Sequence, residues 1–198
     1  MLDIINKKVA VIGFSKRTGV AAAKFLVEHG ANVVVSDVKS SSQLKEEKNM
    51  LKEHEVEYDF NGHSDKLFSC DLFVVSPGVP LDTPFFNKVK KKNITIISEI
   101  ELAYNFNKAN IIAITGTNGK TTTTSLTGKI LQGADKGKVK IAGNIGTPFI
   151  SVVEDLNKDD WFVLEVSSFQ LETIRKFKPD ISMFLNFSPD HLDRHKNE

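Results

Sequence analysis

Short continuous runs of apolar residues alternate with amphipathic segments along most of the 198-residue chain. The runs at 8–14 and 31–37 resemble strands that are buried on both faces of a parallel sheet. Between them, residues 18–30 repeat apolar side chains at helical spacing and end at Gly30, a predicted C-cap. The pattern predicts a strand–helix–strand unit at the start of the chain.

Further apolar runs continue this alternation. The polar segment 39–55 is predicted to be partly loop and partly exposed helix, with its charges on a solvated face. Near 107–110 a predicted helix ends and a fresh buried strand begins, and we place there a boundary between domains 1–108 and 109–198. The remaining predicted strands are 56–60, 71–78, 93–98, 109–116, 161–168 and 180–188, and the remaining predicted helices are 99–106 and 122–132. The fold class is therefore α/β.

Composition narrows the class of protein further. The chain is 40% hydrophobic and 26% charged with a formal net charge of +1, which argues against a nucleic-acid-binding surface. No apolar run approaches the ~20 residues that span a bilayer, and the N-terminus lacks the apolar core of a signal peptide. A single cysteine, Cys70, excludes an intrachain disulfide and is typical of a reducing compartment. We expect a soluble cytoplasmic protein.

A glycine-rich segment, GTNGKTTTT, follows the predicted strand 109–116 and opens the predicted helix. Gly116 and Gly119 allow the backbone to curl around an anion at the positive end of the helix dipole. Lys120 could reach phosphate oxygens, and the Thr121 hydroxyl could bind magnesium. Ile114 occupies the position where the usual phosphate loop has its first glycine. The alternative is an ordinary strand-to-helix turn, although a lysine opposes the dipole there.

Two other predicted strands end in groups that could bind a metal ion. Glu165 closes one apolar run, and Asp190, His191, Asp193 and His195 follow another. These side chains could instead be ordinary solvent-exposed polar residues at a strand end or in a loop. Ligands of open α/β sheets nevertheless gather at the carboxyl ends of strands. The sequence therefore predicts a nucleotide and magnesium site at this edge.

Four motifs in order, GTNGKTTTT, GNIGTPF, LEVSSFQLE and LNFSPDHLDRH, resemble the Mur ligase family of peptidoglycan synthesis. The short form of the phosphate loop is similar to that of the family, which accounts for Ile114. GFSKRTG and SPGVP most resemble the member that adds D-glutamate to UDP-N-acetylmuramoyl-L-alanine; the alanine-adding member is the alternative. The resemblance implies an N-terminal Rossmann-like domain followed by the first part of a P-loop ATPase-like central domain.

The resemblance also implies roles for single residues. GFSKRTG is one residue longer than the common form of that turn, and Val38 and Lys39 replace a more polar pair, so the uridine contacts depart from the family pattern. The resemblance implies that the ATP phosphates contact Gly116, Thr117, Asn118, Gly119, Lys120, Thr121 and Thr122. It implies magnesium ligands at Thr121, Glu165 and His191, and catalytic roles for Lys120, Glu165 and His191. The residues that it implies for the sugar nucleotide are Arg17, Thr18, Asp37, Ser76, Pro77, Gly78, Asn144 and Ser167.

The implied reaction is ATP-dependent amide formation through an acyl phosphate, with ATP and Mg²⁺ required. The D-glutamate site would lie in a part of the family's architecture that follows residue 198, so we expect this chain to be an inactive N-terminal fragment. We also expect it to be a monomer. Two other classes remain open. A nicotinamide-dependent oxidoreductase would use the Gly13 and Gly19 turn with Asp37, and a non-catalytic nucleotide-binding module would keep only the phosphate loop.

Overall fold

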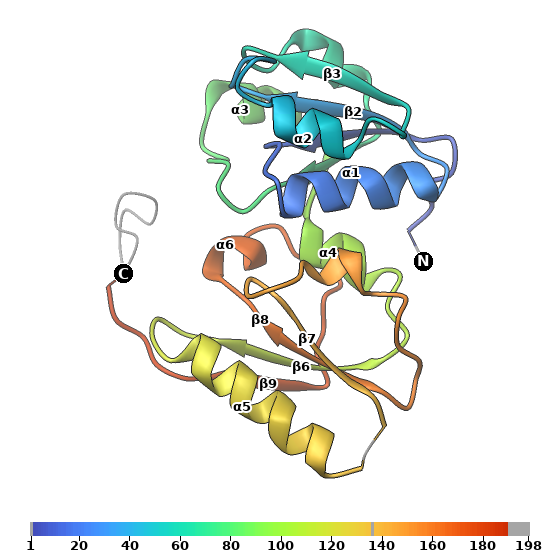
Figure 1. The fold of residues 1–198 in the computed structure, drawn as a ribbon. Coiled ribbons are helices and arrows are strands. Elements are labelled where there is room, and N and C mark those ends of the chain that lie inside the picture. The colour runs from blue at the N-terminus through green and yellow to red at the C-terminus, as the bar shows by residue number, and fades with distance from the viewer. Residues whose placement is uncertain (1, 136, 190–198) are drawn as a thin grey trace.

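Two parallel sheets follow one another along the chain in the computed structural model, which describes residues 2–135 and 137–189 (Figure 1). The first sheet has the strand order β3-β2-β1-β4-β5 and the second the order β7-β8-β6-β9, with all neighbouring strands parallel. The strands are β1 (Lys8–Ile12), β2 (Asn32–Asp37), β3 (Val56–Phe60), β4 (Leu72–Val75), β5 (Thr95–Ser98), β6 (Asn110–Thr115), β7 (Val139–Gly143), β8 (Trp161–Glu165) and β9 (Ile181–Phe184). The predicted α/β class is confirmed.

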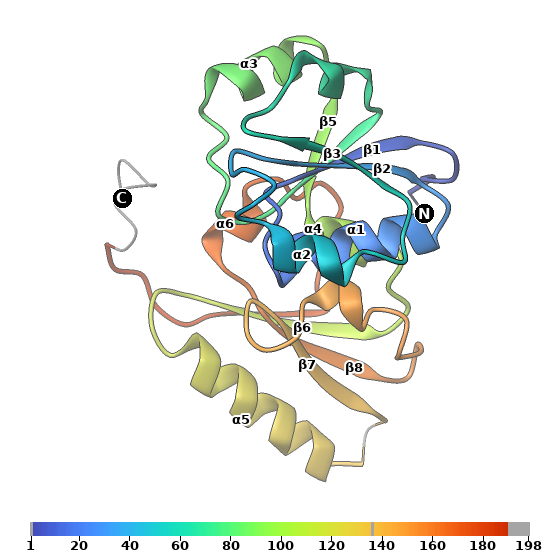
Figure 2. The same ribbon diagram turned by 45° about the horizontal axis from the view of Figure 1, so that its top comes forward.

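Helices separate the two sheets and cover their outer faces. Figures 1 and 2 show α1 and α4 between the sheets and α5 beneath the second sheet, and Figure 2 shows α3 above the first sheet. The helices are α1 (Thr18–Glu28), α2 (Lys45–Met50), α3 (Pro84–Lys91), α4 (Glu99–Tyr104), α5 (Lys120–Gly133) and α6 (Ser168–Leu171), with 3₁₀ turns η1 (Asp65–Ser69) and η2 (Phe149–Ser151).

One apolar core is shared by both sheets. Phe25 and Leu26 of α1 and Ile100 of α4 belong to the same buried cluster as Phe149 and Phe162 of the second half. Separate clusters fill the outer face of each sheet, beneath α3 and beneath α5. Because both faces of the central strands are covered, their sequences are continuously apolar rather than alternating.

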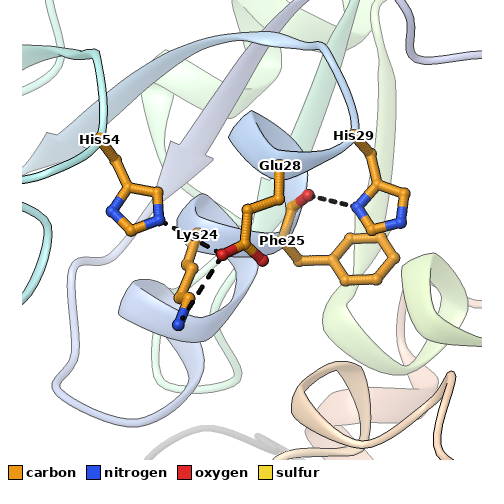
Figure 3. A network of polar contacts seen from close by, with 5 residues as sticks. All are labelled: Lys24, Phe25, Glu28, His29 and His54. Carbon is orange, nitrogen blue, oxygen red and sulfur yellow. Dashed lines mark hydrogen bonds and ion pairs between the residues drawn. The ribbon is translucent and has the colours of Figure 1, made fainter.

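The C-terminal end of α1 carries a small polar network (Figure 3). The carboxylate of Glu28 pairs with Lys24 Nζ at 3.8 Å and with His54 Nε2 at 3.4 Å. The ring of His29 stacks on Phe25 with centroids 3.8 Å apart, and its Nε2 lies 3.2 Å from Glu154 Oε1 in the second half of the chain. The partly exposed ion pairs add little stability, so the shared apolar core does most to hold the halves together.

The structure contains elements that the sequence pattern did not predict. Helix α3 begins at Pro84, and the hydroxyl of the N-cap residue Thr83 accepts a hydrogen bond from Phe86 N at 3.4 Å. A threonine N-cap followed by a proline at the first helical position is a start signal that can be recognised in the sequence. Strand β7 was not predicted because Lys140 interrupts its short apolar run and Lys138 precedes it. No helix among the described residues has the length and apolarity needed to cross a membrane. The division at 108/109 remains a prediction.

Candidate phosphate and metal site

The glycine-rich loop joins β6 to α5. Gly119 is the N-cap of α5 with φ of 80°, and Gly116 has φ of 142°, conformations that side chains disfavour. A Cβ on Gly116 would also lie 3.1 Å from Leu185 Cβ. The loop therefore needs both glycines, and it aims the first amides of a 14-residue helix at one point.

Lys120, the first residue of α5, folds back over this loop. Its Nζ donates hydrogen bonds to Gly116 O at 2.7 Å and to Thr117 O at 2.8 Å. These two carbonyls offset the unfavourable position of a cation at a helix N-terminus. The side chain is half-buried, and its two hydrogen bonds hold the ammonium group against the loop.

Glu165 ends β8 beside the start of α5. Its Oε2 accepts a hydrogen bond of 2.7 Å from Thr121 Oγ1, and its Oε1 accepts one of 2.9 Å from Asn144 Nδ2. The residue is only 3% exposed. In the part of the chain that the structure describes, no ion pair neutralises this carboxylate. A buried carboxylate beside a hydroxyl, without a cationic side chain, is a suitable pair of oxygen ligands for a hard cation.

The segment after β9 closes one side of the loop. Asn186 Oδ1 accepts from Asn118 N at 2.9 Å, and Asn186 Nδ2 donates to Asn118 O at 3.0 Å. Thr117 Oγ1 donates to Ser188 O at 3.0 Å. Sequence analysis missed Asn186, although its place directly after a strand at the same sheet edge could have indicated it.

Some predicted residues lie elsewhere or outside the described part. Asp190, His191, Asp193 and His195 are outside the described residues. Among the described residues no group of three or more His, Cys, Asp or Glu side chains could hold a metal ion. Thr122 is exposed in the first turn of α5. The candidate metal position in this structure therefore consists of Thr121 and Glu165.

Six of the eight predicted sugar-nucleotide residues lie at the carboxyl edge of the first sheet, whereas Asn144 and Ser167 follow β7 and β8 of the second sheet. Asp37 accepts hydrogen bonds from Phe14 N at 2.7 Å and Lys39 N at 2.9 Å, so both of its oxygens hold backbone. Ser76 Oγ donates to Gly13 O at 2.6 Å, which ties the ends of β4 and β1 together. Pro77 and Gly78 follow in the same turn, and Gly78 has open space around it.

Arg17 and Ser167 make contacts that the sequence did not predict. Arg17 Nη2 donates to Gly146 O at 2.7 Å and to Asn144 O at 3.3 Å, so the first turn, which precedes Thr18 at the start of α1, reaches across to the second sheet. The Ser167 hydroxyl takes part in a capping box with Gln170 at the start of α6. Thus Arg17, Asn144 and Glu165 form a connected series between the two sheets.

Two protein-family models match this chain. The Mur ligase middle domain family matches residues 114–198, and the MurD N-terminal domain family matches residues 8–85. The chain belongs to the Mur ligase family. The range 114–198 that matches the middle domain family contains the loop 116–122 and Glu165.

Two relatives of this Mur ligase chain share one name. UDP-N-acetylmuramoylalanine–D-glutamate ligase of Koribacter versatilis is 50% identical over 195 residues, covering 98% of this chain and 43% of the relative. The protein of that name from Alkaliphilus metalliredigens is 47% identical over 198 residues, with 98% of this chain and 43% of the relative covered. The Mur ligase chain thus spans less than half the length of these curated relatives.

Solved structures show that the fold is shared within the family. UDP-N-acetylmuramate–alanine ligase of Thermotoga maritima has a TM-score of 0.55 at 22% identity, covering 97% of this chain and 44% of that one. A Neisseria UDP-N-acetylmuramate:L-alanyl-gamma-D-glutamyl-meso-diaminopimelate ligase has a TM-score of 0.54 at 19% identity, covering 95% and 63%. At these identities the similarity concerns the fold of the Mur ligase chain alone.

Proposed function

We propose that the chain supplies the ATP loop and the sugar-nucleotide site of a ligase that joins D-glutamate to UDP-N-acetylmuramoyl-L-alanine. The observation that carries this proposal is the contact between Thr121 and Glu165 beside the glycine loop. The choice of substrates rests on the names of relatives that are 47–50% identical over nearly the whole chain. The alanine-adding reaction is the main alternative.

The phosphates of ATP would bind where the loop amides and Lys120 converge. Lys120 would exchange its bonds to the Gly116 and Thr117 carbonyls for bonds to phosphate oxygens. The remaining loop residues would contribute backbone N–H groups at the positive end of α5. The glycine conformations described above keep this loop open to an anion.

Magnesium would be held by the Thr121 hydroxyl and the Glu165 carboxylate, both oxygen donors of the kind it prefers. A bound magnesium ion would supply positive charge that offsets the crowded oxygens of the triphosphate and the substrate carboxylate. The unpaired charge and burial of Glu165 fit this role. We further propose His191 as a ligand of a second ion.

In the proposed reaction, the substrate carboxylate attacks the γ-phosphorus of ATP, and ADP leaves. The amine of D-glutamate then attacks the acyl phosphate, and phosphate leaves with formation of the amide. The chain contributes chiefly by positioning. Arg17, Thr18, Asp37 and the turn 76–78 would hold the UDP group, while Asn144 and Ser167 would contact the sugar nucleotide near its reacting end. Fixing reactants in this way can lower a barrier by roughly 7–11 kcal/mol.

We propose that the protein acts as a monomer in the cytoplasm, where soluble nucleotide substrates are available. Sedimentation velocity of the pure chain tests the oligomeric state, and a stable dimer would contradict this part of the proposal.

Titration of the pure chain with Mg·ADP, and separately with the two sugar nucleotides, tests the proposed function. We expect Mg·ADP to perturb the amides of residues 116–122 in NMR spectra. UDP-N-acetylmuramoyl-L-alanine should bind more tightly than UDP-N-acetylmuramate and perturb Thr18, Asp37 and residues 76–78. The reverse order of affinity would favour the alanine-adding reaction. Binding of NADH in place of these ligands would favour the oxidoreductase.

A further inference from the structure

The segment 143–150, called the loop 143–150 below, runs from the last residue of β7 into η2 and is held by hydrogen bonds from two elements of the first half of the chain. On one side, Arg17 donates to the carbonyls of Asn144 and Gly146. On the other side, Glu99 Oε1 accepts a hydrogen bond of 2.6 Å from Ile150 N. The carbonyls and amides of a single loop are thus held by opposite charges from two different elements.

Glu99 is a costly residue to place at this position. It is the first residue of α4, it is 1% exposed, and it lies between the two sheets. Burial raises its pKa to about 7, although the amides of Ile150 and Phe149 and the charge of Arg17 act in the opposite direction. A buried carboxyl that serves only packing could be replaced by an apolar side chain at lower cost.

The opposite end of the same loop contacts the candidate metal ligand. Asn144 binds Glu165 twice, through its side-chain amide at 2.9 Å and through its backbone N–H to Glu165 O at 2.8 Å. At Gly143, with φ of 103°, an added Cβ would lie 2.4 Å from Glu165 O. The loop is therefore packed closely against the end of β8, and a shift of the loop would move Asn144 relative to the Glu165 carboxylate.

We propose that Glu99 and Arg17 are positioning residues that fix the loop 143–150, so that Asn144 orients Glu165 for the nucleotide-bound cation. The nature of that ligand rests on the proposed function, whereas the coupling from Glu99 to Asn144 does not. The first half of the chain thereby sets the geometry of a site on the second sheet.

The same helix offers a matched control. Glu101 is 2% exposed, and its carboxylate accepts hydrogen bonds from the backbone N–H groups of Arg175, Lys176 and Phe177 at 2.9–3.1 Å. Like Glu99, it is a buried glutamate of α4 whose carboxylate accepts hydrogen bonds from backbone N–H groups of the second half of the chain. The segment it holds, however, does not contain Asn144.

The experiment compares Glu99→Ala, Glu99→Gln and Glu101→Ala in the 198-residue chain. The first readout is the side-chain NH₂ signal of Asn144 in ¹⁵N NMR spectra, without any ligand. The second is the affinity for Mg·ADP by calorimetry, and thermal unfolding confirms that each variant is folded. We expect Glu99→Ala to move the Asn144 signal and to weaken Mg·ADP binding about tenfold, as for other groups that support a metal ligand.

Glu99→Gln retains an acceptor oxygen for Ile150 N. In this variant the Asn144 signal should stay at its original position, and the affinity for Mg·ADP should stay within about twofold of the unsubstituted chain, a much smaller change than the loss of a supporting group causes. Glu101→Ala should lower the unfolding temperature but leave both readouts unchanged. An unmoved Asn144 signal in Glu99→Ala, or an equal response to Glu101→Ala, would overturn the proposal. If the unsubstituted chain does not bind Mg·ADP, the proposed function fails, while the Asn144 signal still tests the coupling.

Should Glu99→Ala not fold, Arg17→Met provides the second test. Arg17 is exposed, so its replacement removes the hydrogen bonds to Asn144 O and Gly146 O without disturbing the apolar core. We expect the Asn144 signal to move in this variant also. An unchanged signal in folded Arg17→Met would count against the proposal as directly as an unchanged signal in Glu99→Ala.

Discussion

The carboxyl edges of the two sheets are built from similar parts but arranged differently. Each edge has a strand, a glycine turn and a helix, with an acidic residue at the end of a neighbouring strand. In the first sheet, Asp37 uses both oxygens to hold backbone amides of the chain itself. In the second sheet, Glu165 meets a hydroxyl and a side-chain amide, and in the described part of the chain no cation pairs with it.

The lysines of the two turns differ in the same way. Lys16 in the first turn forms an exposed ion pair with Glu46, whereas Lys120 in the second folds over loop carbonyls. All four side chains have hydrogen-bond partners within the chain, but among the described residues Glu165 and Lys120 of the second edge form no ion pair, so a charged ligand can recruit them. A strand–turn–helix unit alone does not make a phosphate and metal site; the distribution of partners decides.

The largest effect that would separate the two edges is expected from Lys120→Ala. Loss of a charged donor to phosphate should weaken Mg·ATP binding to the chain about 100-fold. The free energy of unfolding should change little, because the ammonium lies at the positive end of a helix and its removal relieves that opposition. Calorimetry and urea unfolding measure the two quantities. Lys129→Ala, on the exposed face of the same helix, is the control, and equal losses of affinity would refute the assignment of the loop.

The pH dependence of stability should reveal the buried carboxyl between the edges. The pKa of Glu99 rises from 4.5 to about 7 on folding, so the folded state binds this proton more tightly than the unfolded state. Stability from this group is therefore complete below pH 4.5 and is lost as the pH rises to about 7. The loss should reach about 3 kcal/mol.

Glu99→Gln cannot titrate and should lack this fall. Urea unfolding of both proteins across the pH range measures the difference between them. Parallel stability profiles of Glu99→Gln and the unsubstituted chain would show that burial does not raise the pKa of Glu99 as described.

Asp37→Ala should have a smaller effect, confined to the first edge. It leaves the amides of Phe14 and Lys39 without their acceptor, which should lower the free energy of unfolding by about 2 kcal/mol. Mg·ADP affinity should stay within twofold of the unsubstituted chain, since Asp37 belongs to the other sheet. Urea unfolding and calorimetry test both expectations, with the exposed Asp65→Ala as control. A large loss of Mg·ADP affinity would contradict the separation of the two edges.

Lys16→Ala should have the smallest effect. Its ion pair with Glu46 is solvent-exposed, and such pairs contribute little to stability. We expect no measurable change in unfolding temperature and no change in Mg·ADP affinity, in contrast to Lys120→Ala. A marked loss of Mg·ADP affinity would mean that Lys16 contributes to nucleotide binding as Lys120 does, which would contradict the proposed difference between the two turns.

The sequence alone determined the strands of the first sheet, three of the four strands of the second sheet (β6, β8 and β9) and the position of the phosphate loop. Continuous apolar runs such as 8–12 and 110–115 can be satisfied only by burial on both faces. Gly116, Gly119 and Lys120 revealed the loop because few residue types suit a left-handed turn at a helix start, and Glu165 was found because it ends an apolar run. These are local rules, readable within a short window.

Only the tertiary structure decided which of these residues meet. The contact of Arg17 with Gly146, and that of Glu99 with Ile150, join residues 129 and 51 positions apart. Nothing in the local pattern of EIELAY distinguishes a surface glutamate from one buried between two sheets. That distinction arises because α4 packs against η2 across the shared core, which forces the carboxyl of Glu99 to take its partners from a loop of the other half.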